Sequence, residues 1–185
     1  TVGHMLTELF LDSLDVDEER RRQLGANAEA FGLGLQLTNI LKDITDDRER
    51  AMSFIPRDVC DAAGVPLSDL LVADRRHAAH AALKPVFGRA NDALDGAFAY
   101  CLALPPEAKD VRLFCLLPRW MAVAPLEPAR GNDAQFEPDQ PVKIDRGTVA
   151  EVIRVCTSIA ADDDALREGY MALRGGITPE TGRRP

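Results

Sequence analysis

The spacing of apolar residues constrains the fold of this chain more than any other feature of the sequence. Within residues 17–50 they recur at steps of three to five: Leu24, Ala28, Phe31, Leu35 and Ile40. Such steps follow one face of an α-helix, which turns once in about 3.6 residues. No part of the sequence shows the sustained alternation of apolar and polar residues that is typical of a strand. The sequence therefore predicts an all-α protein.

Proline, glycine and acidic residues predict where the helices begin and end. The expected helical segments are residues 2–11, 17–50, 56–64, 74–104, 107–126, 148–159 and 163–173. Residues 127–141 are rich in Pro, Gly, Asn and Asp and are expected to form a loop. The chain opens at "TVGHMLTELF", which reads as the inside of a helix. We therefore expect residues 1–176 to be the C-terminal part of a single domain, with 177–185 as a flexible tail.

Composition and charge exclude some classes of function. A length of 185 residues suits one domain, and a net charge of −8 argues against a nucleic-acid partner, which requires a basic face. Four scattered cysteines without a C-x-x-C pair indicate reduced thiols. No apolar run reaches the ~18 residues that would span a bilayer. We expect a cytoplasmic protein.

Three aspartates, Asp43, Asp46 and Asp47, crowd into five positions of the segment "LQLTNILKDITDDRER". On one continuous helix they share an arc of roughly 100° with Gln36 and Asn39, and we call these five residues the polar arc. Like charges at this spacing weaken a helix by roughly a few tenths of a kcal/mol per pair. Five apolar residues are expected directly beside the arc: Leu33, Leu37, Ile40, Leu41 and Ile44.

Two interpretations of the polar arc stay open on spacing alone. In the first, the carboxylates bind Mg²⁺, which takes oxygen ligands and is usually shared between one or two carboxylates and substrate phosphates. In the second, the arc is a solvated acidic face at the end of a long helix, which is common in soluble proteins. Gln36 and Asn39 favour the first, because an exposed face would more readily carry Glu or Lys.

Four segments carry a resemblance to a known family. The stretch "GLGLQLTNILKDITDD", followed by "FIP", resembles the second aspartate-rich motif of the squalene and phytoene synthases. "TVGHMLTELF" is similar to the helix that precedes this motif in the family. "FCLLPRWMA" and "PVKIDRG" resemble segments of the squalene synthase branch in particular. The resemblance spans almost the whole chain.

The resemblance implies an isoprenoid synthase fold: a terpene synthase-like helical bundle with a central cavity, of which this chain is a part. It implies a transferase that condenses two farnesyl diphosphates head to head through presqualene diphosphate. Mg²⁺ would assist ionisation of the diphosphate, and NADPH would supply a hydride in the squalene branch. The expected partners are prenyl diphosphate substrates, and a peripheral membrane contact that delivers them stays open.

The family's functional residues map onto individual positions of this sequence. The resemblance implies metal ligands at Asp43, Asp46 and Asp47, and catalytic roles for Asp43, Asp47, Asn39 and Gln36. It implies substrate contacts at Lys42, Phe114, Leu33 and Leu37. It implies NADPH contacts at Asn39, Lys143 and Arg146.

Three departures from the family pattern leave alternatives open. The first aspartate-rich motif would lie upstream of Thr1, so this stretch alone is expected to be inactive. Ala51 and Met52 stand where the family usually has Gly-Arg, and Asp145 stands where the squalene branch tends to have a second basic residue. The alternatives are a phytoene or dehydrosqualene synthase that uses no reductant, and a non-catalytic helical protein that binds lipid or a partner.

Overall fold

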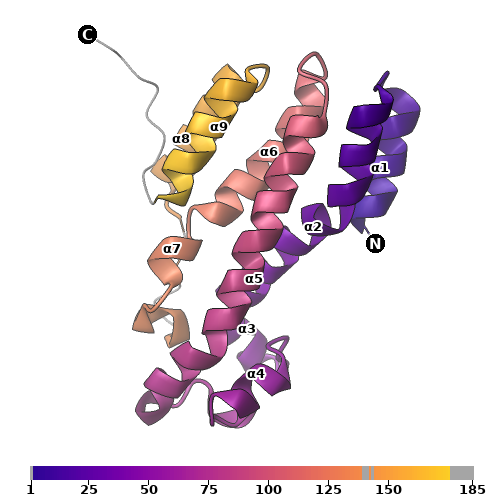
Figure 1. Cartoon of the computed structure of the whole chain (residues 1–185). Helices are drawn as coiled ribbons and strands as arrows, with labels where there is room; N and C mark the ends of the chain where they lie inside the picture. Colours follow the sequence, from indigo (N-terminus) through magenta and orange to yellow (C-terminus); the bar gives the residue numbers. More distant parts are fainter. Residues whose placement is uncertain (1, 139–141, 143, 176–185) are drawn as a thin grey trace.

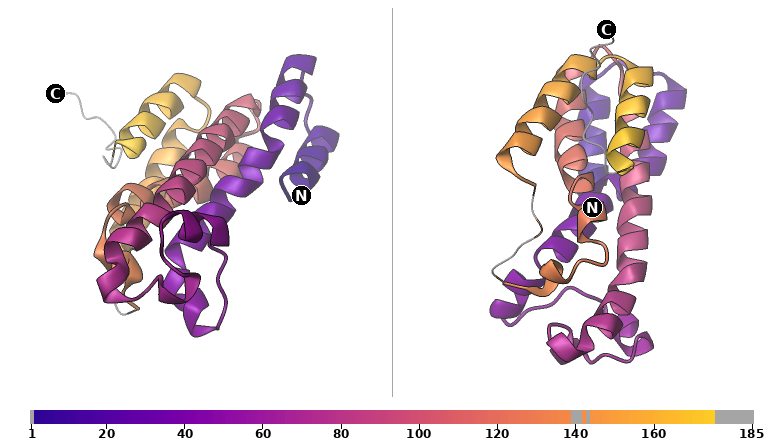
Figure 2. Two further views of the ribbon diagram at one scale, coloured as in Figure 1. Left: turned by 60° about the horizontal axis from the view of Figure 1, so that its bottom comes forward. Right: turned by 90° about the vertical axis from the view of Figure 1, so that its left-hand side faces the viewer.

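The computed structural model describes residues 2–138, 142 and 144–175, and every regular element within them is a helix (Figures 1 and 2). The α-helices are α1 (Val2–Ser13), α2 (Glu18–Lys42), α3 (Ile44–Glu49), α4 (Arg57–Ala62), α5 (Arg76–Ala103), α6 (Lys109–Val123), α7 (Leu126–Ala129), α8 (Arg146–Ile159) and α9 (Asp163–Arg174). Short 3₁₀ turns are η1 (Leu67–Asp69), η2 (Ala73–Arg75) and η3 (Asp133–Phe136). The predicted all-α class is confirmed. None of the helices in the described ranges is both long and apolar enough to cross a bilayer.

The central pair of the fold is α2 and α5, which cross at close range (Figure 1). The buried stripe of α2 recurs at helical steps: Leu24, Ala28, Phe31, Gly34, Thr38 and Leu41. At Gly34, an added Cβ would lie only 3.1 Å from the backbone nitrogen of Leu94 in α5. Glycine at this position therefore sets how closely the two helices can approach.

Helix α1 is fixed on the N-terminal half of α2. A Cβ on Gly3 would lie 1.9 Å from the carbonyl oxygen of Ala28, so only glycine permits this contact. The Thr7 hydroxyl lies 3.0 Å from the hydroxyl of Tyr100 in α5, and the Tyr100 ring stacks on Phe31 at 4.2 Å. Burial raises the pKa of Tyr100 to about 12. These contacts make α1, α2 and α5 one packed unit.

A buried arginine joins three helix ends near the C-terminus of α5. Arg112 of α6 is fully buried, and its guanidinium donates to the carbonyl oxygens of Leu104 at 2.9 Å and Ala160 at 3.0 Å. It also forms an ion pair of 2.7 Å with Asp163, at the start of α9. Arg20 of α2 donates to the same group of carbonyls at the end of α5. The last carbonyls of a helix lack partners within the helix, and these two arginines satisfy them.

The structure corrects the predicted elements at two places. The expected helix over residues 17–50 is divided into α2 and α3 by Asp43, whose φ is −101° and ψ 19°. Crowded carboxylates and the β-branched Ile44 and Thr45 all weaken a helix there. The expected loop over residues 127–141 contains α7 and η3, because Leu126 and Phe136 anchor it in the core. The predicted boundary between a domain over residues 1–176 and a tail falls outside the described residues.

Candidate active site

The candidate site begins at the C-terminal end of α2, where the helix breaks. Up to Lys42 the helix is regular, and the Asp43 amide still donates to Asn39 at 2.8 Å. After Asp43, the Asp47 amide donates to the Asp43 carbonyl at 2.8 Å, which is the first hydrogen bond of α3. Asp43 therefore serves as the C-terminal cap of α2 and the N-terminal cap of α3.

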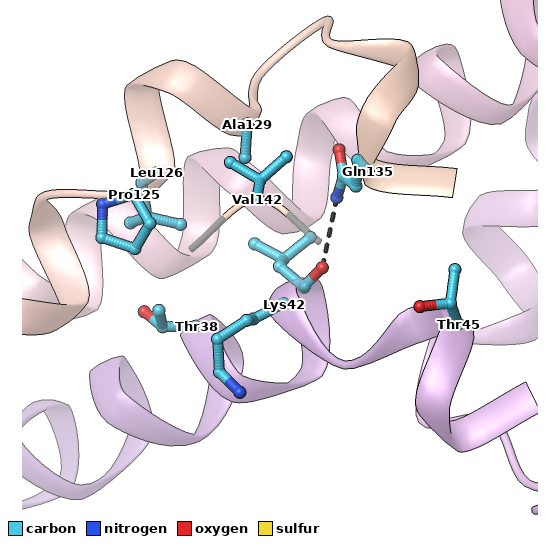
Figure 3. A pocket seen from close by; sticks show the side chains of 9 residues that line it. Thr38, Lys42, Thr45, Pro125, Leu126, Ala129, Gln135 and Val142 are labelled. Atoms are coloured by element: carbon cyan, nitrogen blue, oxygen red, sulfur yellow. Dashed lines mark hydrogen bonds between the residues drawn. The ribbon is translucent and has the colours of Figure 1, made fainter. Parts of the chain in front are cut away.

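Gln135 of η3 supports this break from the opposite side. Its side-chain Nε2 donates to the carbonyl oxygen of Leu41 at 3.3 Å (Figure 3). The Leu41 carbonyl belongs to the last turn of α2, where carbonyls have no partner within the helix. Gln135 is buried, and its Oε1 has no hydrogen-bond partner. The buried amide thus ties the end of α2 to the turn η3.

Each of the two aspartates one turn apart has a cation beside it. Asp43 is 29% exposed at its side chain and forms an ion pair with Lys42. Asp47 is buried, and its Oδ1 lies 4.0 Å from the guanidinium of Arg50. Arg48 instead donates to the Ser68 carbonyl at 3.3 Å. Lys42, which lies roughly 40° outside the arc on an ideal helix, pairs with Asp43, the next residue in the chain, at the point where the helix breaks.

The part of the polar arc that lies in α2, Gln36 and Asn39, is on the face opposite the packed stripe of that helix, which corrects the predicted surroundings, whereas Asp47 in α3 is buried. On the helix, Thr38 and its buried neighbours lie roughly 180° from Gln36, and Gln36 and Asn39 are exposed. Asp46 is half-buried. The apolar residues expected beside the arc divide into buried Leu41 and Ile44 and half-buried Leu33, Leu37 and Ile40. The arc therefore borders partly open apolar surface rather than a closed core.

The turn after α3 carries an unusual backbone at Ala51. The Met52 amide donates to the Asp47 carbonyl at 2.9 Å and the Ala51 amide to the Arg48 carbonyl at 3.0 Å. This pair of bonds is the Schellman motif, in which the residue after the cap adopts a left-handed conformation. Ala51 has a φ of 57°, in a region that favours glycine. The departure from the family's glycine at this position therefore strains the turn that closes α3.

A narrow pocket at the end of α2 brings residues of two predicted segments together (Figure 3). Its lining includes Thr38, Lys42 and Thr45 from the acidic segment and Val142 from "PVKIDRG". Its free volume of about 10 Å³ is about enough for one water molecule, so it is a packed contact rather than a substrate cavity. The two motifs lie far apart in the sequence and meet here.

The residues predicted to contact the prenyl chain lie in different surroundings. Phe114 of α6 is 56% exposed and packs edge to face on Phe10 of α1, with 6.3 Å between the ring centroids. Leu33 instead lines a groove with Arg89 of α5. Leu37 is half-buried and packs against the core. The structure does not bring Leu33 and Phe114 to one wall, and their substrate contacts stay predictions.

The predicted NADPH contacts are described only in part. Asn39 and Arg146 are exposed, and Arg146 is the first residue of α8. Lys143 lies outside the described residues. Asp145 caps α8, since its carboxylate accepts from the Thr148 amide at 2.7 Å. This hydrogen bond lowers the pKa of Asp145, so the acid that departs from the squalene-branch pattern has a structural role.

The carboxylates fit Mg²⁺ in chemistry but do not form a complete site. Their oxygens are the hard ligands that Mg²⁺ prefers. Among the described residues, no group of three or more His, Cys, Asp or Glu side chains could hold a metal ion. Mg²⁺ commonly takes one or two protein carboxylates and completes its shell with phosphates and water. Asp43 and Asp47 therefore suit an ion that is shared with a diphosphate.

Two buried polar residues that contact α2 were not predicted to matter. The sequence does not indicate the role of Gln135, because this residue lies in a segment whose composition is typical of a loop. Arg119 lies within "FCLLPRWMA", is only 6% exposed, and donates to the Phe31 carbonyl at 2.9 Å. Its guanidinium lies 3.4 Å from the centre of the Phe31 ring, and burial lowers its pKa. Both residues attach the back of α2 to other elements.

Comparison with known proteins identifies the family. The sequence profile described as squalene/phytoene synthase matches residues 1–148. The chain belongs to this family. Squalene synthase from Candida albicans is 30% identical over 82% of this chain, and that from Schizosaccharomyces pombe is 28% identical over 82%. The solved structure of TcSQS in a ligand complex superposes with a TM-score of 0.77 at 26% identity, and covers 98% of this chain.

These relatives are longer than this chain. It spans 34% of the Candida albicans squalene synthase and 32% of the Schizosaccharomyces pombe protein. It spans 52% of the TcSQS chain. The predicted family and the terpene synthase-like fold class are confirmed over the length of this chain.

Proposed function

We propose that the full-length protein is a squalene synthase-like prenyltransferase. It would condense two farnesyl diphosphates head to head through presqualene diphosphate. The observation that carries this proposal is the ordered motif on the open face of α2, which ends in two aspartates one turn apart at a supported break. The similarity to squalene synthases of Schizosaccharomyces pombe and Candida albicans supports the same branch.

We assign separate roles to the residues around the break. Asp43 and Asp47 would bind Mg²⁺, with Asp46 as a supporting acid, and bound Mg²⁺ would neutralise charge on the leaving diphosphate. Lys42 lies against Asp43 and would contact a diphosphate oxygen once the carboxylate turns to the ion. Gln36 and Asn39 would line the site of the second half-reaction, since they share the open face with Asp43.

The remaining parts of the site would come from the rest of the longer protein. A dry apolar pocket is needed to protect an allylic carbocation from water. In this chain the open face of α2, with half-buried Leu37, and the exposed ring of Phe114 would form one side of that pocket. The remainder of the protein would supply the first aspartate-rich motif and the facing wall.

NADPH use separates the two catalytic alternatives. In the squalene branch, NADPH supplies a hydride to the cyclopropyl intermediate, and Asn39, Lys143 and Arg146 would hold the cofactor. In a phytoene or dehydrosqualene synthase the reaction ends by proton loss instead. The neighbourhood of Val142 and Lys42 supports the squalene branch, because it brings the "PVKIDRG" segment to the end of α2.

The test is to incubate the full-length protein with farnesyl diphosphate and Mg²⁺, with and without NADPH, and to identify the products by mass spectrometry. We expect squalene only when NADPH is present. A product that does not change with NADPH would support the dehydrosqualene alternative. No consumption of farnesyl or geranylgeranyl diphosphate, in a full-length protein that lacks an upstream aspartate pair, would support the non-catalytic alternative.

A further inference from the structure

A second cleft, separate from the aspartates, lies between α5 and α9. Its volume is about 610 Å³, which is in the range of small-molecule sites. Figure 1 shows α9 beside the upper part of α5, whereas α3 and α4 lie at the other end of the molecule. The cleft shares no lining residue with the pocket beside Lys42. Six of its lining residues define its chemistry: Asn91, Asp95, Phe98, Arg167, Tyr170 and Arg174.

The floor of the cleft is held in place by a network across the two helices. Tyr170 stacks flat on Phe98, with ring centroids 4.0 Å apart and planes at 7°. The Tyr170 hydroxyl donates to Asp95 at 2.8 Å. The Arg174 guanidinium donates to Asp95 at 3.2 Å and also to the buried Asn91. Arg174 is thus oriented by two side chains, Asp95 and Asn91, which reduces the conformational entropy that a ligand contact would otherwise lose.

The charge of the cleft is opposite to that of the chain. Its lining contains three arginines, including Arg130, and one aspartate, a formal excess of two positive charges in a chain of net charge −8. Arg167 pairs with Asp164, whose side chain is 93% exposed. Exposed pairs of this kind are weak, so a multiply charged anion would compete well for the Arg167 guanidinium. Arginine is the residue best suited to bind phosphate oxygens in pairs.

We propose that this cleft binds a phosphate-bearing anion through Arg167 and Arg174. The rings of Phe98 and Tyr170 are buried against each other, so they offer only a small apolar contact to the organic part of such a ligand. This site is independent of the proposed reaction, because no Mg²⁺ and no carboxylate from the polar arc takes part. Two kinds of ligand would present such a phosphate group to the arginines: a soluble polyphosphate ester and the headgroup of an anionic lipid.

The first arm of the test uses inorganic pyrophosphate and the full-length protein in a buffer with EDTA, so that Mg²⁺-dependent binding at the aspartates is absent. We expect titration calorimetry to detect binding, and Arg167→Gln to weaken it about tenfold, as the loss of one charge-assisted contact implies. Arg154→Gln is the matched control, because Arg154 also pairs with an acid three residues away on an exposed helix face. Asp47→Asn should leave this metal-free binding unchanged.

The second arm replaces pyrophosphate with vesicles of phosphatidylglycerol or phosphatidylcholine in a sedimentation assay. Binding to the anionic vesicles that falls in Arg167→Gln and not in Arg154→Gln would identify a lipid headgroup as the source. Equal binding by the two variants in both arms, or no binding in either, would overturn the proposal. Circular dichroism of each variant checks that the fold is intact, and Arg167 is the preferred probe because Arg174 also holds α9 on α5.

Discussion

Ala51 is an alanine whose backbone adopts a conformation that favours glycine. It closes the turn after α3 with a φ of 57°, and a side chain in this region is disfavoured by about 1 kcal/mol relative to glycine. We therefore expect Ala51→Gly to raise the free energy of unfolding by roughly 1 kcal/mol. Urea denaturation of the purified protein would measure the change.

The control for Ala51→Gly is Ala26→Gly, at an exposed position inside α2. There the backbone is helical, and glycine should lower stability by about 1 kcal/mol. If both substitutions destabilise the protein, the left-handed conformation of Ala51 is not a source of strain.

Asp43 is the residue on which the proposed chemistry depends most. We expect Asp43→Asn in the full-length enzyme to abolish turnover, because the amide removes the negative charge that would hold Mg²⁺. The fold should survive, since the Asp43 side chain is partly exposed and its cap contacts are made by its backbone. Steady-state assays with farnesyl diphosphate and a melting curve would test both statements. Unimpaired turnover would remove Asp43 from the metal site.

At the scale of elements, the contact between η3 and the end of α2 holds the two halves of the acidic segment in place. Gln135→Ala would leave the Leu41 carbonyl without its partner, and an unsatisfied buried group costs about 1–3 kcal/mol. We expect the urea midpoint to fall accordingly. Asn132→Ala is the control, because Asn132 caps η3 without touching α2. An equal loss in both variants would show that only the turn itself had been weakened.

The same elements show which features of the fold and of the candidate site the sequence alone predicts. Helical period and the proline and glycine boundaries predicted α5, α8 and α9 closely, since local propensity and packing agree there. The division of α2 from α3 was missed, because the crowded carboxylates only weaken a helix, and the support that Gln135 gives the break comes from 94 residues away in the sequence. The aspartates were found from their spacing, but their surroundings depend on which face of α2 packs on α5. That choice is made by Gly34 and other tertiary contacts that no local pattern reveals.

At the scale of the whole molecule, Arg112 connects the ends of α5 and α8 with the start of α9. We expect Arg112→Met to lower the free energy of unfolding by about 3–5 kcal/mol, as for other buried ion pairs that lose one partner. Arg20→Met removes a partly exposed arginine from the same carbonyls and should cost about 1 kcal/mol. Equal losses would mean that burial of Arg112 adds nothing.

The buried thiols make the stability of the whole molecule sensitive to alkaline pH. All four cysteines are buried, and burial raises the pKa of Cys101 and Cys156 to about 12. Thiols of the unfolded chain ionise at about 8.5, so the stability that the protonated thiols contribute is complete below that pH. It is lost as pH rises from there towards 12. We expect urea midpoints to fall over this range, and iodoacetamide to modify the native protein at pH 8 far more slowly than the unfolded one.

The break at Asp43 has a mechanical consequence for the molecule. On one side, α2 is locked to α5 by the close approach at Gly34, and on the other, α3 contacts η3. Any movement that fits the carboxylates of Asp43 and Asp47 to a bound ligand is then confined to backbone rotation at Asp43, between the two anchored helices α2 and α3. The carboxylates of Asp43 and Asp47 would therefore approach or separate by rotation about the Asp43 backbone. The residue at position 43 would set how far they can move.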